Sequence, residues 1–151
     1  MHVELIIGTA VILASIILAA IGFWLAEGMV ARMTPWLLRE PHRPKLTLVL
    51  VLAVLMILGV FTATVWLWAF TFLWLDLFNT LEGAVYFAIV AFTTLGFGDV
   101  LLDPGWRILG GMTAANGLLN MGLYTAMLVE LLRSVRSNQL SGQPKRSDFP
   151  D

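Results

Sequence analysis

The sequence predicts an all-α membrane protein with three transmembrane helices and one short helix that enters the membrane and returns. Of its 151 residues, 59% are hydrophobic and 13% are charged, and the mean hydropathy is +0.87. A soluble domain is nearer half apolar and a quarter charged. Three apolar segments are long enough to cross a membrane, and a fourth is too short. The net charge of −1 gives no reason to expect nucleic acid as a partner, and the lack of cysteine excludes disulfides and thiolate metal sites.

The first transmembrane helix is expected from Val3 to about Ala26, within a segment of residues 1–27. It is interpreted as a retained helix and not as a signal peptide, because no Lys or Arg precedes it and its apolar run is longer than a signal's. Small residues recur on one stripe of this helix, which predicts a packing face. The alternative is that such residues are simply common in membrane helices. They are Gly8, Ser15, Ala19, Gly22 and Ala26.

Residues 28–45 are expected to form a basic cytoplasmic loop, with a short surface helix over 33–40. The loop holds four of the nine Lys and Arg residues. Residues 46–75 contain no charged side chain, which predicts a second transmembrane helix with length to spare. This helix opens a segment of residues 46–136 that is expected to form one domain.

A short helix is expected over residues 84–93, started by Asn79 as N-cap with Glu82 three residues on. About ten residues are too few to span a membrane. The following stretch, Thr93-Thr94-Leu95-Gly96-Phe97-Gly98-Asp99, is a poor membrane helix because of its hydroxyls and glycines. Glycine enters left-handed backbone conformations at little steric cost, so alternate handedness could turn successive carbonyls toward one side.

Residues 94–99 resemble the T-x-G-[YF]-G-D selectivity filter of the potassium channel superfamily, and residues 84–106 are similar to its pore region without a gap. The resemblance implies that residues 46–136 form a pore domain. It further implies that the chain assembles as a homotetramer with fourfold symmetry and that membrane lipids surround it. It also implies that K+ is the permeant ion, coordinated by backbone carbonyls, and that no cofactor is needed. The residues implied are Thr94, Leu95, Gly96, Phe97 and Gly98 for the filter, the first four as K+ ligands, with Thr93, Asp99 and Tyr86 as support.

Four positions depart from the commoner pattern of that superfamily. Phe97 replaces a tyrosine, so one hydrogen bond from filter to pore helix is unavailable. Val90 stands where some relatives have a glutamate, and Tyr86 where many have a tryptophan bonded to the aspartate. A Tyr86–Asp99 hydrogen bond is therefore expected. Leu101 stands where an aromatic residue in relatives binds quaternary ammonium ions.

The last transmembrane helix is expected from about Trp106 to Arg136, followed by a disordered cytoplasmic tail over 137–151. Asn116 and Asn120 share one face. We expect them to line the water-filled cavity of the pore, with an interhelical hydrogen bond as the alternative. Gly117 lies one residue from the hinge glycine of relatives, and close packing is the alternative. Glu130 belongs either to an acidic ring at the inner mouth or to a pair with Arg133.

The basic residues also predict the topology. With three crossings and one re-entrant loop, the cluster in 28–45 and the cluster near the C-terminus fall on the same, cytoplasmic side. The N-terminus is then outside, the C-terminus is cytoplasmic, and Asp99 faces outward in a multi-pass protein of the cell membrane. The C-terminal cluster consists of Arg133, Arg136, Lys145 and Arg146.

The sequence thus predicts a potassium-selective ion channel and not an enzyme, because no acid–base constellation lies in the membrane segments. Two other functions remain open at this point. One is a weakly selective channel for monovalent cations on the same scaffold. The other is a non-conducting scaffold or regulatory subunit that keeps the pore fold. No helix carries arginine at every third position, so a voltage sensor of the usual kind is not expected.

Overall fold

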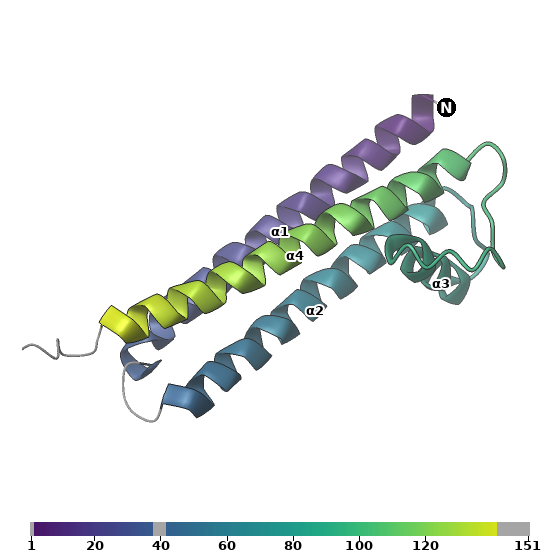
Figure 1. Cartoon of the computed structure of the whole chain (residues 1–151). Coiled ribbons are helices and arrows are strands. Elements are labelled where there is room, and N and C mark those ends of the chain that lie inside the picture. The colour runs from purple at the N-terminus through teal and green to yellow at the C-terminus, as the bar shows by residue number, and fades with distance from the viewer. Residues whose placement is uncertain (1, 38–41, 142–151) are drawn as a thin grey trace, which may run out of the picture.

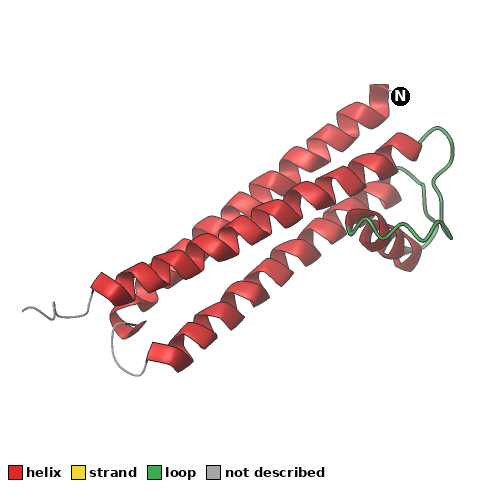
Figure 2. Cartoon of the chain, viewed as in Figure 1, coloured by secondary structure: helices red, strands yellow, loops and turns green. Residues whose placement is uncertain are grey.

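The computed structural model describes residues 2–37 and 42–141, and within these ranges the chain is helical with no strand (Figure 2). The four helices are α1 (His2–Leu37), α2 (His42–Trp74), α3 (Leu81–Phe92) and α4 (Arg107–Ser141). The predicted order of long, long, short and long helices is therefore confirmed. The loops that join α2, α3 and α4 lie at one end of the molecule (Figure 2).

The three long helices lie side by side, and α3 lies at one end, in contact with α2 and α4 (Figure 1). The N-terminus and the loop after α3 are at that end, whereas the end of α1, the start of α2 and the end of α4 are at the other. The 36 residues of α1 extend over about 54 Å at 1.5 Å per residue, which exceeds a hydrocarbon core.

Two helices are long and apolar enough to cross a membrane, over His2–Met33 and Thr47–Trp74. The third long helix, α4, does not pass the same test within the described residues. It contains Asn116, Asn120 and Glu130, and its glycines lower its hydropathy further. It nevertheless packs along α1 and also contacts α2 and α3.

The predicted packing stripe of α1 is present, because all five of its small residues are buried. A Cβ on Gly8 would lie 2.5 Å from Sδ of Met112 in α4, and a Cβ on Gly22 would lie 2.6 Å from Cγ2 of Val60 in α2. Small side chains on α1 therefore let it approach both neighbouring helices closely.

The loop predicted over 28–45 is largely wrong, because α1 continues to Leu37 and α2 begins at His42. The separate surface helix over 33–40 is likewise replaced by the end of α1 as far as Leu37. The physical reason is packing: Val30 is buried in one cluster with residues from α2 and α4, so the helix contacts continue past Ala26. Residues 38–41 of the predicted loop lie outside the described residues.

The predicted tail also differs from the structure, since α4 continues through Ser141. Its remainder, 142–151, lies outside the described residues. Leu131 of α4 is buried in the same cluster as Val30, which extends the contact between α1 and α4 toward the end of both helices.

An aromatic core fixes the position of α3. Phe87 and Phe92 of α3 are buried together with Trp68 and Phe72 of α2. The rings of Phe72 and Phe87 meet edge to face with centroids 5.2 Å apart. Each buried ring removes a large apolar area from solvent or lipid, and edge contacts add to that stabilisation. The short helix is thus held against α2 along its length.

Candidate functional site

The short helix α3 begins with a side-chain cap and ends directly at the glycine-spaced stretch. Thr80 is the N-cap in extended conformation, and its hydroxyl oxygen accepts a hydrogen bond of 3.1 Å from the Gly83 amide. Asn79 was predicted as N-cap, so that prediction is wrong by one residue. Glu82 still lies in the first turn, where a carboxylate complements the helix dipole.

The last carbonyls of α3 accept hydrogen bonds from the stretch that follows. Val90 O accepts from the amides of Leu95 at 3.0 Å and Gly96 at 3.3 Å, and Ala91 O accepts from Thr94 at 2.9 Å. The Thr93 hydroxyl donates to Ile89 O at 2.7 Å. The first half of the stretch is therefore tied to the end of α3, because its amides satisfy carbonyls that the helix leaves open.

Left-handed backbone alternates along this stretch. Thr94, Gly96 and Gly98 have φ values of +59°, +56° and +75°. The handedness predicted at the two glycines is therefore present, whereas the left-handed conformation of Thr94 has no signal in the sequence. A β-branched residue rarely adopts it, so the contacts around Thr94 must hold it there. Alternate left-handed residues can turn successive backbone carbonyls toward one side of the chain.

The side chains between these positions point away from the body of the single chain. Leu95 is 56% exposed and Phe97 is 67% exposed. Phe97 has no hydroxyl, so it offers no side-chain hydrogen bond to α3. Thr94, Gly96 and Gly98 line a shallow cavity of about 280 Å³ together with Gly110 and Ala114 of α4.

The predicted hydrogen bond between Tyr86 and Asp99 is present. The Tyr86 hydroxyl donates to Oδ2 of Asp99 at 2.5 Å. This bond is the main reason that the pKa of Asp99 lies below its ordinary value, against a smaller opposing effect of desolvation. Val90, which stands where some relatives have a glutamate, is buried and apolar. The bond therefore joins α3 to the far end of the glycine-spaced stretch.

Tyr86→Phe is expected to raise the pKa of Asp99 toward its ordinary value. The hydrogen bond favours the ionised carboxylate of Asp99. Its contribution to stability is therefore present above the ordinary pKa of an aspartate and is lost as the pH falls through the lowered pKa of Asp99. Without the hydroxyl, Asp99 takes up its proton at higher pH. A carboxyl ¹³C chemical-shift titration of Asp99 in detergent measures this. Tyr124→Phe, at the chain's other tyrosine, is the matched control and should leave the Asp99 titration unchanged; an equal midpoint in Tyr86→Phe and the control contradicts the prediction.

The cavity position predicted for Asn116 and Asn120 is not what the structure has. Both side chains are fully buried and turn toward α1. Asn116 Oδ1 accepts from Ser15 Oγ at 2.8 Å and from Asn120 Nδ2 at 2.7 Å. The alternative, an interhelical hydrogen bond, is therefore the correct one. The sequence indicates Ser15 only as a small residue of the α1 packing stripe, and no pattern in it predicts the polar partners of this side chain.

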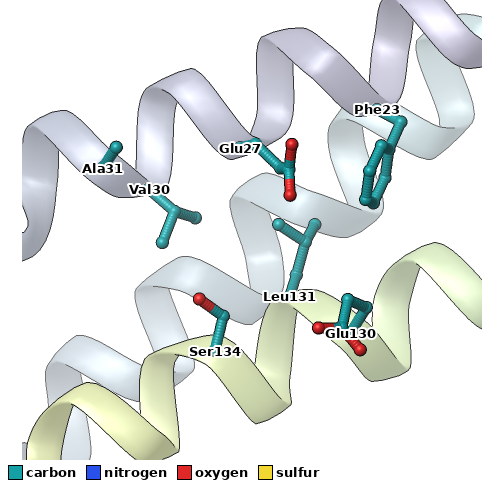
Figure 3. Close-up of a pocket in the computed structure, with 7 residues that line it drawn as sticks. All are labelled: Phe23, Glu27, Val30, Ala31, Glu130, Leu131 and Ser134. Atoms are coloured by element: carbon teal, nitrogen blue, oxygen red, sulfur yellow. The ribbon is translucent and has the colours of Figure 1, made fainter.

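Glu130 is exposed on α4 and makes no ion pair with Arg133 in the described part of the chain. It lines a cavity of about 480 Å³ between α4 and α1, together with Glu27 and Phe23 of α1. Figure 3 shows Glu27 and Glu130 on the two facing helices, with Leu131 between them. Of the two roles predicted for Glu130, the pair with Arg133 is therefore absent from this structure.

Comparison with known proteins places the chain in a family. The family model described as "Ion channel" matches residues 46–134, which is 89 of the 151 residues. The chain therefore belongs to this ion-channel family. As predicted, it is not an enzyme. The matched range runs from the start of α2 to the last turns of α4 and includes α3 and the glycine-spaced stretch.

A particular relative is the "Potassium voltage-gated channel protein shk-1" of Caenorhabditis elegans, which is 29% identical over 77 residues. The similar stretch covers 49% of this chain and 14% of the relative, so the chain spans only a small part of that protein's length. Among solved structures the chain has no significant match.

Proposed function

We propose that this chain is the subunit of a potassium-selective channel in which backbone carbonyls of Thr94, Leu95, Gly96 and Phe97 replace the hydration shell of K+. The observation that carries the proposal is the left-handed backbone at every second residue from Thr94 to Gly98. Carbonyls arranged in successive rings can coordinate a bare monovalent cation. The name of the C. elegans relative supports potassium as that ion.

A single chain supplies one such stretch, so the proposal includes four copies around a central axis. Leu95 and Phe97 are more than half exposed in one chain, and neighbouring copies are their expected cover. The C-terminal end of α3 carries partial negative charge and adjoins the stretch, which favours a cation on the axis. Exposed carbonyls would also be satisfied by the ion and not by lipid.

In this proposal α1, α2 and α4 all cross the membrane of the cell. The N-terminus and Asp99 are then outside, and the end of α4 is cytoplasmic. The N-terminus and α3 lie at one end of the molecule and the end of α4 lies at the other, which supports this topology (Figure 1). Arg32 near the end of α1, and Arg133 and Arg136 near the end of α4, are then at the cytoplasmic end, in agreement with the distribution of basic residues in membrane proteins.

A channel of weak selectivity among monovalent cations is the second candidate, and one observation favours it. Phe97 lacks the hydroxyl that could tie the filter to α3, so the four filters have fewer restraints on their diameter. Potassium efflux from liposomes that contain only this chain tests both candidates against a non-conducting scaffold. Efflux under a potassium gradient is expected, and its absence from correctly inserted protein would contradict both channel functions.

Leu101→Tyr is expected to strengthen external block by tetraethylammonium. Leu101 is 71% exposed, two residues beyond Asp99, and has no ring to attract a cation. Four tyrosine rings that each contribute about 0.5 kcal/mol would together add about 2 kcal/mol, or some thirtyfold in affinity. Dose–response curves at one voltage and fixed potassium measure the effect, with Leu118→Tyr on the exposed side of α4 as a control at a different depth. Equal half-blocking concentrations in Leu101→Tyr and the parent would mean that residue 101 does not surround the entrance.

A further inference from the structure

A polar cluster connects α1 to α4 in the middle of otherwise apolar helices. It consists of Ser15, Asn116 and Asn120, all buried. Beside the two short bonds to Asn116 Oδ1, Asn120 Nδ2 donates to Asn116 O at 2.9 Å and lies 3.3 Å from Ser15 Oγ. One turn before Asn116, the end of the Met112 side chain lies so close to Gly8 that it would have to move if residue 8 had a Cβ. The cluster thus sits where α1 and α4 approach each other closely.

The cluster is not fully satisfied, which distinguishes it from ordinary packing. Ser15 has one hydroxyl hydrogen, and both Ile12 O and Asn116 Oδ1 lie 2.8 Å from its oxygen. Asn116 Nδ2 and Asn120 Oδ1 are buried with no hydrogen-bond partner. Incomplete polar networks in apolar surroundings are poorer for stability than apolar side chains of the same shape. We therefore infer that the three side chains fix the position of α4 and add little to the stability of the fold.

Gly117, the residue next to Asn116, connects the position of α4 to the base of the proposed filter through a backbone contact. A Cβ on Gly117 would lie 1.6 Å from the Phe92 carbonyl oxygen, so the backbone of α4 rests directly on the last residue of α3. Two residues earlier, Val90 O holds the amides of Leu95 and Gly96. A displacement of α4 at this level is therefore transmitted by direct contacts to the filter stretch.

We propose that α1 is a built-in positioning helix for the conduction path: Ser15, through Asn116 and Asn120, holds α4 against the end of α3 and keeps the filter in its conducting arrangement. The inference rests on the proposed channel function. It assigns a role to the helix that precedes the family match, which begins only at residue 46. All three side chains are buried between α1 and α4 and lie outside the stretch from Thr94 to Gly98, so in this proposal they act on conduction through α4.

The test is single-channel recording from the purified full-length chain in lipid bilayers. Ser15→Ala is expected to lower open probability by about threefold or more, the change that corresponds to one hydrogen bond between membrane helices. The reversal potential and the unitary conductance should stay at the parent values, because the filter lining is unaltered. Thr9→Ala removes a hydroxyl from an exposed position of the same helix and is the matched control. The melting temperature in detergent reports whether each variant is folded.

A second variant separates the cluster from general effects on α1. Asn116→Ala leaves Ser15 its bond to Ile12 O and should lower open probability by a similar factor. Ser15→Ala combined with Asn116→Ala should lower open probability little more than either change alone, since both remove the hydrogen bond between Ser15 and Asn116. An open probability of Ser15→Ala equal to or above that of Thr9→Ala would overturn the inference while the channel function stands. A parent protein that passes no potassium current would instead overturn the channel function, and the inference with it.

Discussion

Gly96→Ala is expected to abolish potassium conduction or selectivity while the protein still inserts and folds. Gly96 has φ +56°, and a Cβ built there meets no atom within 4 Å. The obstacle is therefore the backbone conformation and not space. A left-handed alanine costs about 1–2 kcal/mol, and in the proposed tetramer each of the four copies would carry that cost at the same level of the axis. Relief by rotation to a right-handed conformation would turn a carbonyl away from the ion.

The measurement is the potassium-to-sodium permeability ratio and the conductance of the variant in bilayers. Gly105→Ala is the matched control, since Gly105 lies in the loop just beyond Asp99, has nothing within 4 Å and is not left-handed. The control should conduct like the parent. A parent-like permeability ratio in Gly96→Ala would refute the assignment of this stretch as the filter.

Gly117→Ala is expected to separate α4 from α3, with loss of both stability and conduction. The added Cβ would lie 1.6 Å from the Phe92 oxygen and 2.6 Å from its carbonyl carbon. These are backbone atoms, so no side chain can rotate out of the way. Overpacking of this kind costs typically about 1–3 kcal/mol per site and more when backbone must move. Of the two roles considered for Gly117, close packing is thus the one that its surroundings support.

The melting temperature of the detergent-solubilised protein and the current in bilayers measure this effect. Gly59→Ala is the control, because Gly59 is in the middle of α2 with nothing within 4 Å. It should be neutral or slightly stabilising, since alanine favours a helix by about 1 kcal/mol over glycine. A Gly117→Ala protein with parent-like melting and current would mean that α4 does not rest on α3 in the native protein.

The elements that the sequence predicted well are those set by local chemistry. The uncharged run of 46–75, the short helix before the glycines and the left-handed glycines all depend on residues close in sequence. The Tyr86–Asp99 bond could also be predicted, because the two residues lie 13 positions apart in a stretch with a known family pattern. The end of α1 could not be predicted in this way. It depends on the packing of Val30 against residues of α2 and α4, whereas the proline and the charged residues near Val30 favour a loop.

Asn116 and Asn120 illustrate why part of the site could not be predicted from the sequence. Asn116 and Asn120 share a face, and a polar face on an inner helix fits a cavity as well as it fits a partner helix. The partner is Ser15, 101 residues away from Asn116, and no periodicity connects them. The left-handed Thr94 is similar, because its conformation depends on hydrogen bonds to the end of α3 and not on its own preference.

The central claim is that the stretch from Thr94 to Gly98 selects potassium, and the reversal potential of the purified chain in a bilayer tests it most directly. With potassium at unequal concentrations on the two sides and sodium making the total cation concentration equal, the account predicts a current that reverses near the potassium equilibrium potential. That potential should move by about 59 mV for each tenfold change in the potassium gradient. A reversal potential near zero under this potassium gradient would contradict the claim.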